Sequence, residues 1–211
     1  MSKFIARRIS RKLSRNKKKL LYQCQSNIAM FGASCVGKTA IMKKFATSLY
    51  QDEDYKPTLT EVYERSITLR SQDGKVCKHS LSLLDTSGKL RLDFPSMYRQ
   101  AIISCEAFVL VFALDDENSL TEIEDILRDI DIIKKGFTSP ILIIANKSDA
   151  VESNGQQNKL SKQLANINRG CCFKTSALNQ SDFTESFVYL LTEIERRKGI
   201  DRSFYGVQVE R

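Results

Sequence analysis

One glycine-rich loop, residues 32–39, constrains the fold of this chain more than any other segment. It has the pattern Gly-x4-Gly-Lys-Thr, and it lies between an apolar run and a segment with helical spacing. A strand, a glycine loop and a helix in this order predict a phosphate-binding site. Gly32 and Gly37 let the backbone turn its N–H groups toward phosphate oxygens, and the helix N-terminus adds partial positive charge. We expect Lys38 to reach the β- and γ-phosphates and the Thr39 hydroxyl to bind Mg2+.

The composition is that of one globular domain with extensions. The chain has 211 residues, and 42% of them are apolar, which suffices for a buried core. Six cysteines show neither Cys-x-x-Cys nor Cys/His spacing, so we expect reduced intracellular thiols. His79 is the only histidine, which argues against a histidine-based triad or metal cluster. No apolar run approaches transmembrane length.

The positive charge is concentrated at the N-terminus. The net charge is +8, and nine of the 33 Lys and Arg residues lie in segment 1–22, which has no acidic residue. The remaining chain therefore carries 24 basic and 25 acidic residues. This balance argues against nucleic-acid binding by the domain itself.

Segment 1–25 forms a basic N-terminal extension. Ile5, Ile9 and Leu13 recur every four residues between basic side chains, which is typical of an amphipathic helix. Three interpretations remain open: a solvated, disordered tail, an anchor on an anionic membrane surface, and a mitochondrial or nuclear targeting segment.

Strands alternate with helices through segment 26–197, which predicts an α/β fold with a mostly parallel sheet. An Asp-Gly turn at 73–74 predicts one antiparallel hairpin. We expect strands at 26–31, 62–70, 76–84, 108–114, 141–145 and 171–174. We expect helices at 38–49, 93–103, 118–135, 159–168 and 182–197. Segment 198–211 is a short C-terminal tail to which we assign no role.

Polar segments follow the ends of three of these strands, at the sheet edge where ligands bind. Asp85 follows the third strand and is placed to hold the Mg2+ shell, and the amide of Gly88 to meet a γ-phosphate. Asp149 ends an Asn-Lys-x-Asp segment, and its carboxylate can accept hydrogen bonds from guanine N1–H and the 2-amino group. Adenine offers neither donor, so this site selects guanine. The backbone N–H groups of Ser176 and Ala177 are placed to donate to guanine O6.

The loop at 51–60 supplies Thr58, a second hydroxyl for Mg2+ and for the γ-phosphate. The residues that we expect to contact the nucleotide or its metal are Gly32, Ala33, Ser34, Cys35, Val36, Gly37, Lys38, Thr39, Ala40, Tyr55, Thr58, Asp85, Gly88, Asn146, Lys147, Asp149, Ser176 and Ala177. The expected metal ligands are Thr39, Thr58 and Asp85. The expected catalytic residues are Lys38, Thr58, Gly88 and Lys89.

With these segments in order, residues 26–197 resemble a Ras-family small GTPase, a P-loop GTPase fold with a six-stranded sheet and about five helices. Segments 85–88 and 94–97 resemble most the Dexras/Rhes and DiRas branches. The resemblance implies GTP, GDP and Mg2+ as ligands, switch I at 51–60 and switch II at 86–98. It also implies effector, exchange-factor and activating proteins as partners, and a monomer in the cytoplasm.

The chain departs from the family pattern in three places. Lys89 stands where the family has the water-orienting glutamine, and a lysine donates but cannot accept a proton. Ser34 replaces a glycine and crowds the space that an activating arginine enters. The end Gln208-Val209-Glu210-Arg211 lacks a prenylation cysteine, so we expect no C-terminal prenyl anchor.

These features predict a slow GTPase that signals through its switch loops. The alternative is an interaction module that stays bound to GTP almost permanently and has no useful turnover.

Overall fold

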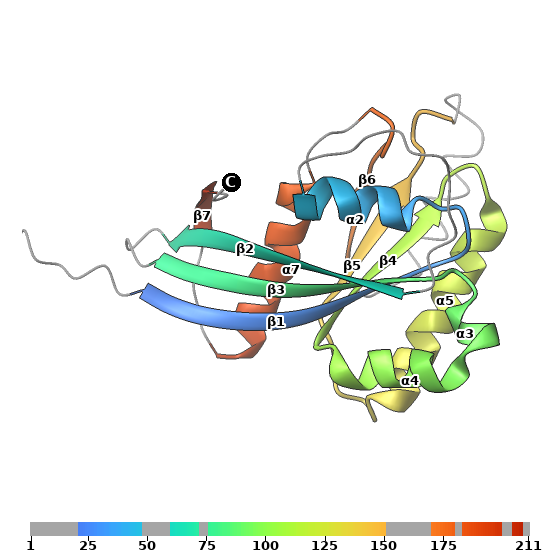
Figure 1. The fold of residues 1–211 in the computed structure, drawn as a ribbon, viewed down its shortest axis with the longest axis horizontal. Helices are drawn as coiled ribbons and strands as arrows, with labels where there is room; N and C mark the ends of the chain where they lie inside the picture. Colours follow the sequence, from blue (N-terminus) through green and yellow to red (C-terminus); the bar gives the residue numbers. More distant parts are fainter. Residues whose placement is uncertain are drawn as a thin grey trace, which may run out of the picture.

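The computed structural model describes residues 21–47, 60–71, 76–150, 170–179, 183–199 and 204–208, which form one sheet with helices on both faces (Figure 1). The strands are β1 (Leu21–Phe31), β2 (Thr60–Ser71), β3 (Val76–Thr86), β4 (Ala107–Ala113), β5 (Ile141–Asn146), β6 (Cys171–Lys174) and β7 (Phe204–Gln208). The helices are α2 (Lys38–Thr47), α3 (Leu90–Asp93), α4 (Pro95–Ser104), α5 (Glu117–Ile133) and α7 (Thr184–Arg197).

The strands lie in the order β6-β5-β4-β1-β3-β2-β7. β1 is parallel to its neighbours β3 and β4, and β5 and β6 continue the parallel series. β2 runs antiparallel to β3. The predicted α/β fold is confirmed: the six expected strands form a mostly parallel sheet with one antiparallel pair, and β7 is added at the edge. Because β3 and β4 lie on opposite sides of β1, a ligand crevice is expected at the carboxyl end of β1.

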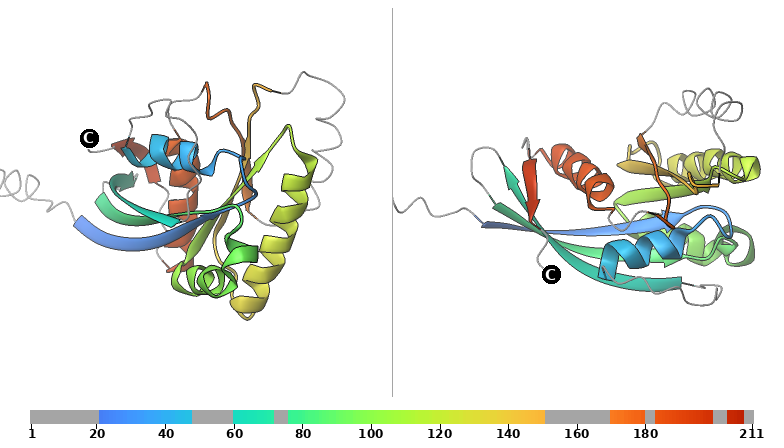
Figure 2. Two further views of the ribbon diagram at one scale, coloured as in Figure 1. Left: turned by 45° about the vertical axis from the view of Figure 1, so that its right-hand side comes forward. Right: turned by 90° about the horizontal axis from the view of Figure 1, so that it is seen from above.

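An apolar layer packs on each face of the sheet. On one face α2 and α7 cover alternate residues of β1 and β3, and the rings of Phe45 and Phe187 stack with their centroids 3.5 Å apart. On the other face α4 and α5 cover Phe31 and Phe108. Figure 1 shows α2 above the sheet and α3 and α4 below it, and Figure 2 gives two further views. The sheet thereby fixes the strand ends from which the candidate site is built.

Three elements differ from the sequence prediction. β1 begins at Leu21 rather than at residue 26, because segment 21–25 pairs with the start of β3 although it lacks an apolar run. The helix expected at 93–103 is divided at Phe94, since the residue before a proline disfavours helical backbone. β7 adds a seventh strand, antiparallel to β2, from a segment without a predicted role.

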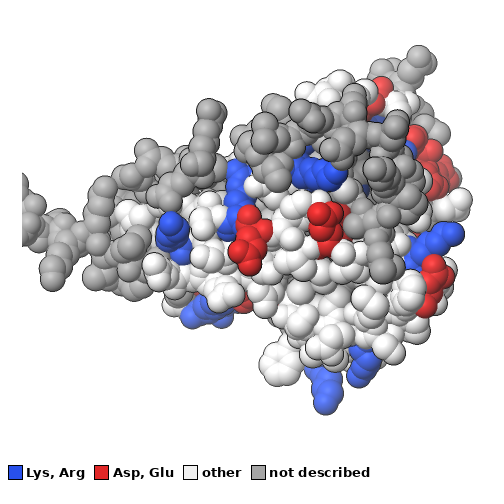
Figure 3. All heavy atoms as spheres, in the orientation of Figure 1, with Lys and Arg blue, Asp and Glu red and all other residues white. Residues whose placement is uncertain are grey.

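Several predictions fall outside the described residues. These are the extension up to residue 20, the loop 51–59 with Tyr55 and Thr58, and the helix expected at 159–168. Within the described residues, no helix combines the length and the apolar character that crossing a bilayer requires. On the face in Figure 3, Lys and Arg residues (blue) and Asp and Glu residues (red) are interspersed among uncharged residues.

Candidate nucleotide-binding site

The loop 32–39 connects the end of β1 to the start of α2, and its glycines are required by its shape. Gly32 has φ 143° and Gly37 has φ 96°, which L side chains rarely adopt. A Cβ at Gly32 would overlap the carbonyl oxygen of Val111, and one at Gly37 would overlap the side-chain amide of Asn146. The loop is therefore packed tightly against the ends of β4 and β5.

Lys38 lies in the mouth of this loop. Its Nζ donates to the carbonyl oxygens of Gly32 at 2.8 Å and Ala33 at 2.6 Å. The side chain is only 6% exposed, and burial lowers the pKa of Lys38 to about 8. An anionic ligand beside the ammonium group would favour its charged form and raise that pKa again.

Thr39 and Asp85 meet where β1 and β3 end. The Thr39 hydroxyl donates to Asp85 Oδ2 at 2.6 Å. The Asp85 side chain is fully buried, and its Oδ1 has no hydrogen-bond partner among the described residues. Burial raises the pKa of the Asp85 carboxyl, against the opposing effects of Thr39 and the Lys38 charge. Next to it, the Thr86 hydroxyl donates to the Met30 carbonyl at 2.6 Å and fixes this end of β3 against β1.

The residues present fit a Mg2+ ion. Magnesium prefers hard oxygen ligands and binds through one or two carboxylates together with the phosphates of a ligand. The Thr39 hydroxyl and the buried Asp85 carboxylate meet beside the phosphate loop. One oxygen of that carboxylate has no hydrogen-bond partner among the described residues. Thr39 and Asp85 would hold the ion here, while the other predicted ligand, Thr58, lies outside the described residues.

The segment after β3 packs directly on the phosphate loop. A Cβ at Gly88 would overlap the backbone of Ser34, so only glycine allows this approach. Lys89 follows at the start of α3, where its side chain is exposed and its backbone N–H donates to Ser87 Oγ at 3.2 Å. Ser34 is also exposed. The structure thus brings Ser34 and Lys89, two of the three departures from the family pattern, to neighbouring backbone segments.

Asn146 connects the phosphate loop and the loop after β6 to the end of β5. Its side-chain Nδ2 donates to the Val36 carbonyl at 2.8 Å, and its Oδ1 accepts from the Ala177 N–H at 2.8 Å. The side chain is only 1% exposed. The phosphate loop, the end of β5 and the loop after β6 are therefore one connected unit. In this structure the N–H of Ala177, which the sequence assigns to guanine O6, is the donor to Asn146.

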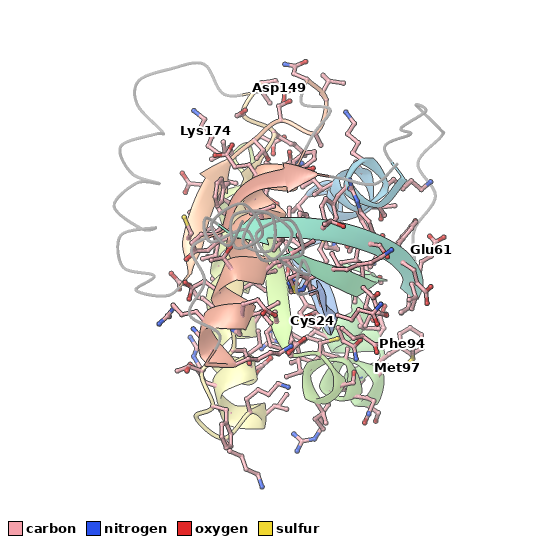
Figure 4. All side chains as sticks on the ribbon, turned by 90° about the vertical axis from the view of Figure 1, so that its left-hand side faces the viewer. Cys24, Glu61, Phe94, Met97, Asp149 and Lys174 are labelled. Atoms are coloured by element: carbon pink, nitrogen blue, oxygen red, sulfur yellow. The ribbon has the colours of Figure 1, made fainter. Side chains whose placement is uncertain are left out.

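Asp149 lies three residues further, in an exposed position. The Ser176 hydroxyl donates to its Oδ1, and the backbone Ser148 N–H donates to the Thr175 carbonyl at 2.9 Å. Its carboxylate is thus oriented from the loop after β6 while remaining accessible to a ligand. Figure 4 labels Asp149 at the upper edge of the molecule, beyond the strands.

Two supporting residues were missed by sequence reasoning. Asp115, just after β4, accepts from Lys147 Nζ at 3.1 Å, and Lys147 has the strained φ of 60°. Lys44 of α2 donates to the carbonyl of Ala177. Asp115 could have been predicted, because it follows a buried strand and therefore lies at the same sheet edge as the other site residues. Lys44 had none, because one basic residue on a helix is common.

The fold and this edge define an α/β protein of the P-loop nucleotide-binding class. Comparison with known proteins narrows the class, because a model of the Ras family matches residues 27–196. The GTP-binding protein Di-Ras2 of Pongo abelii is 33% identical over 186 residues, which cover 86% of this chain and 89% of that relative.

Two further relatives extend this finding. The GTP-binding protein drn-1 of Caenorhabditis elegans is 32% identical over 81% of this chain and 76% of its own length. The human GTP-binding protein Rhes is 28% identical over 78% of this chain and 63% of its own length. The chain belongs to the Ras family of small GTP-binding proteins, and its predicted similarity to the DiRas and Rhes branches is confirmed.

Proposed function

We propose that this protein is a molecular switch that binds GTP and GDP together with Mg2+ and hydrolyses GTP slowly. The observation that carries the proposal is the position of Asn146, whose amide joins the phosphate loop to the loop after β6. One rigid unit therefore holds both the phosphate-binding groups and the carboxylate that reads the base. Relatives that are themselves named GTP-binding proteins support the same ligand.

Guanine selection rests on Asp149. Its carboxylate can accept hydrogen bonds from guanine N1–H and the 2-amino group, and Ser176 holds one of its oxygens in place. Adenine has an unprotonated N1 and no 2-amino group, so an adenine base would leave the carboxylate without a partner. Sites that hydrogen-bond their ligand in this way discriminate by several kcal/mol.

Phosphate binding rests on the loop amides, Lys38 and Thr39. Lys38, now bonded to loop carbonyls, would exchange these bonds for phosphate oxygens. Thr39 and Asp85, which are already in contact, would hold the metal. Magnesium, when bound, neutralises charge on the phosphates. The loop amides and Lys38 orient the terminal phosphate toward Gly88.

Signalling is proposed to run through the loops 51–60 and 86–98. Thr58 and Gly88 would hold them closed on the γ-phosphate and release them after its loss. The second segment contains α3 and the start of α4, and its Leu92, Phe94 and Met97 are 79%, 43% and 45% exposed. Phe94 and Met97 lie next to each other, on the same side of the molecule as Glu61 of β2 (Figure 4). Exposed apolar side chains of this kind suit contact with effector, exchange-factor and activating proteins.

The switch segment is anchored on its inner side. Arg91 donates to Asp129 at 2.7 Å and to Asp125 at 3.2 Å, both on α5, and the Tyr98 hydroxyl donates to Asp129 at 3.2 Å. Leu90 is buried in the apolar layer on this face of the sheet. A segment that is fixed at α5 and packs on the phosphate loop at Gly88 is suited to transmit the state of the phosphate.

Slow hydrolysis is the expected result of Lys89. A protonated lysine can neutralise phosphate charge, but it cannot accept a hydrogen from the attacking water as a glutamine amide does. Ser34, whose backbone touches Gly88, reduces the room for an activating arginine. The same two residues support the second candidate, a module that stays bound to GTP almost permanently.

Nucleotide extraction from freshly purified protein, followed by chromatography, tests the proposal. A cycling switch is expected to carry mainly GDP, and the permanently bound module mainly GTP. ATP or ADP as the bound nucleotide would contradict both. A single-turnover assay on the GTP-loaded protein then gives the hydrolysis rate directly.

A further inference from the structure

Four potential metal ligands meet at the end of the sheet opposite the nucleotide site. They are Cys24 of β1, Cys77 and His79 of β3 and Glu195 of α7, and their ligand atoms all lie within 4.8 Å of one another. Cys77, His79 and Glu195 are buried, and Cys24 is partly buried. Figure 4 looks at the molecule from the side on which β1 begins and labels Cys24.

The strand register brings these side chains together. Cys24 pairs directly with His79, and Cys77 lies two residues before His79 on the same face of β3. This is the face that α7 covers, with Ile194 in the apolar layer and Glu195 next to it. The cluster thus consists of side chains held by two central strands and a helix rather than by loops.

The burial of these groups makes any charge on them costly. His79 is 0% exposed and Glu195 is 1% exposed. Their Nε2 and Oε1 atoms are 3.6 Å apart, too far for a good hydrogen bond. Buried charges in proteins are paired or coordinate metals, and a buried pair recovers its desolvation cost only with good geometry. Two thiols in contact with such a pair complete a set of four ligands.

We propose that Cys24, Cys77, His79 and Glu195 form a structural zinc site. Thiolate, imidazole and carboxylate are the ligands that zinc takes, and structural zinc sites are tetrahedral with four protein ligands. The two Sγ atoms are 3.3 Å apart, and tetrahedral zinc with Zn–S bonds of about 2.3 Å needs about 3.8 Å. A small side-chain rotation supplies the difference.

The ligand set also identifies the class of metal. Two soft thiolates disfavour Mg2+ and Ca2+, and a redox-inert ion suits a site that protein ligands fill completely. Zinc binding releases the two thiol protons to solvent and leaves the site with one net negative charge. Without a metal, burial raises the pKa of the Cys24 thiol, and the Lys198 charge in the turn after α7 only partly opposes this. A bound zinc ion would therefore have to displace the thiol proton itself.

The site is separate from the nucleotide. Cys24 precedes the last residue of β1, Phe31, by seven positions, which is on the order of 23 Å along a strand. Zinc would therefore connect α7 to β1 and β3 without contact to the phosphate loop. It would also fix the end of α7 just before the chain returns to form β7. The wide sequence separation of the ligands explains why spacing alone argues against a metal cluster.

Zinc content and ligand identity of the full-length protein test the proposal. The protein, purified without chelators, is expected to contain about one zinc per chain by mass spectrometry of the metal. X-ray absorption at the zinc edge should show two sulfur neighbours near 2.3 Å and two nitrogen or oxygen neighbours near 2.0–2.1 Å, as in roughly tetrahedral protein sites. Zinc-free protein that also takes up none on incubation would overturn the proposal, as would a shell without sulfur. A Cys24–Cys77 disulfide in the mass spectrum, with no zinc bound, would assign the cluster to a redox pair instead.

A matched pair of cysteine variants locates the metal. Cys77→Ser is expected to lower zinc affinity by about tenfold or more. Mutation of residues that only support the ligands of a metal site already lowers metal affinity by that factor. Cys105→Ser, another buried thiol but on the opposite face of the sheet, should leave it unchanged. Glu195→Gln should also weaken binding, in a chelator competition read out by zinc release. Equal zinc affinity in all three variants would overturn the assignment. If Cys77→Ser does not fold, the absorption spectrum of the cobalt-substituted parent still reports whether thiolates bind the metal.

Discussion

The hydroxyl of Thr39 donates to Oδ2 of Asp85 at 2.6 Å and joins the first turn of α2 to the end of β3. The two residues are 46 positions apart in the sequence. Their contact places the two predicted metal ligands of the described residues side by side, next to a carboxylate oxygen that has no hydrogen bond there. The loss of either side chain should therefore affect the metal site rather than the base site.

Thr39→Asn should weaken GTP binding about tenfold more than GDP binding, a difference of about 1.4 kcal/mol. The larger amide displaces the hydroxyl that holds the ion shared with the terminal phosphate. Competition binding with both nucleotides in magnesium buffer measures the two affinities. Thr121→Asn, on the exposed side of α5, is the matched control and should change neither. An equal loss for GTP and GDP would argue against a site that senses the γ-phosphate.

Asp149→Asn should change base preference from guanine to xanthine, because an amide can donate to the 2-oxygen of xanthine. Loss of two hydrogen bonds to a charged acceptor should lower GTP affinity by about 100-fold or more. Affinities for GTP and XTP measured on the same preparation give the ratio. Asp116→Asn is the control, since Asp116 caps α5 through the Asn118 N–H and asparagine caps a helix equally well. Unchanged GTP affinity in Asp149→Asn would refute the assignment of guanine recognition.

Lys89→Gln should raise the single-turnover rate of GTP hydrolysis by about tenfold or more, which corresponds to a barrier lower by about 1.4 kcal/mol. The amide both donates to and accepts from the attacking water, which a lysine cannot do. Lys89→Ala separates the removal of the lysine from the gain of the amide and should not accelerate the reaction. A rate in Lys89→Gln at or below that of the parent would show that another residue orients the water.

Nucleotide affinity should depend on pH through Lys38. In the free protein, burial lowers the pKa of Lys38 to about 8, and bound phosphate raises that pKa. Below pH 8 Lys38 is already charged, so nucleotide binding is accompanied by little proton uptake and the affinity depends little on pH. Above pH 8 binding must add a proton to Lys38, and affinity should fall by up to about tenfold per pH unit. Lys38→Arg remains charged throughout and should lose this component, which titrations from about pH 7 to about pH 9 would show. The same slope in both proteins would mean that Lys38 does not titrate here.

The shared sheet edge of the candidate site could be predicted because its residues lie in short contiguous segments at strand ends. The pattern around Lys38 and the carboxylates of Asp85 and Asp149 follow apolar runs, so their common sheet edge could be inferred from the alternation of strands and helices. Loop-to-loop contacts such as that between Asn146 and Val36 could not, since no local pattern encodes which backbone carbonyl an amide reaches.

The errors in the fold have local physical causes. Segment 21–25 has too few residues for a decisive strand pattern, and its pairing with β3 shows that it is a strand. The break at Phe94 was readable from Pro95 and was overlooked. The cluster of Cys24, Cys77 and Glu195 could not be predicted, because it depends on the register of β1 against β3 and on the rotation of α7 about its axis.

The last prediction concerns the basic segment 1–22, whose nine Lys and Arg residues carry the charge excess of the chain. Each such residue near an anionic leaflet contributes about 1 kcal/mol, and the attraction is screened beyond about 8 Å at physiological ionic strength. The full chain should therefore sediment with vesicles that contain anionic lipid, more at low salt than at high salt. A chain that begins at Leu20 keeps all of β1, which starts at Leu21, and should not sediment. A full-length variant with Lys17, Lys18 and Lys19 changed to Gln should bind less and keep the apolar positions intact. Equal sedimentation of the full and shortened chains would exclude the segment from membrane binding, and sedimentation of neither would favour a solvated tail.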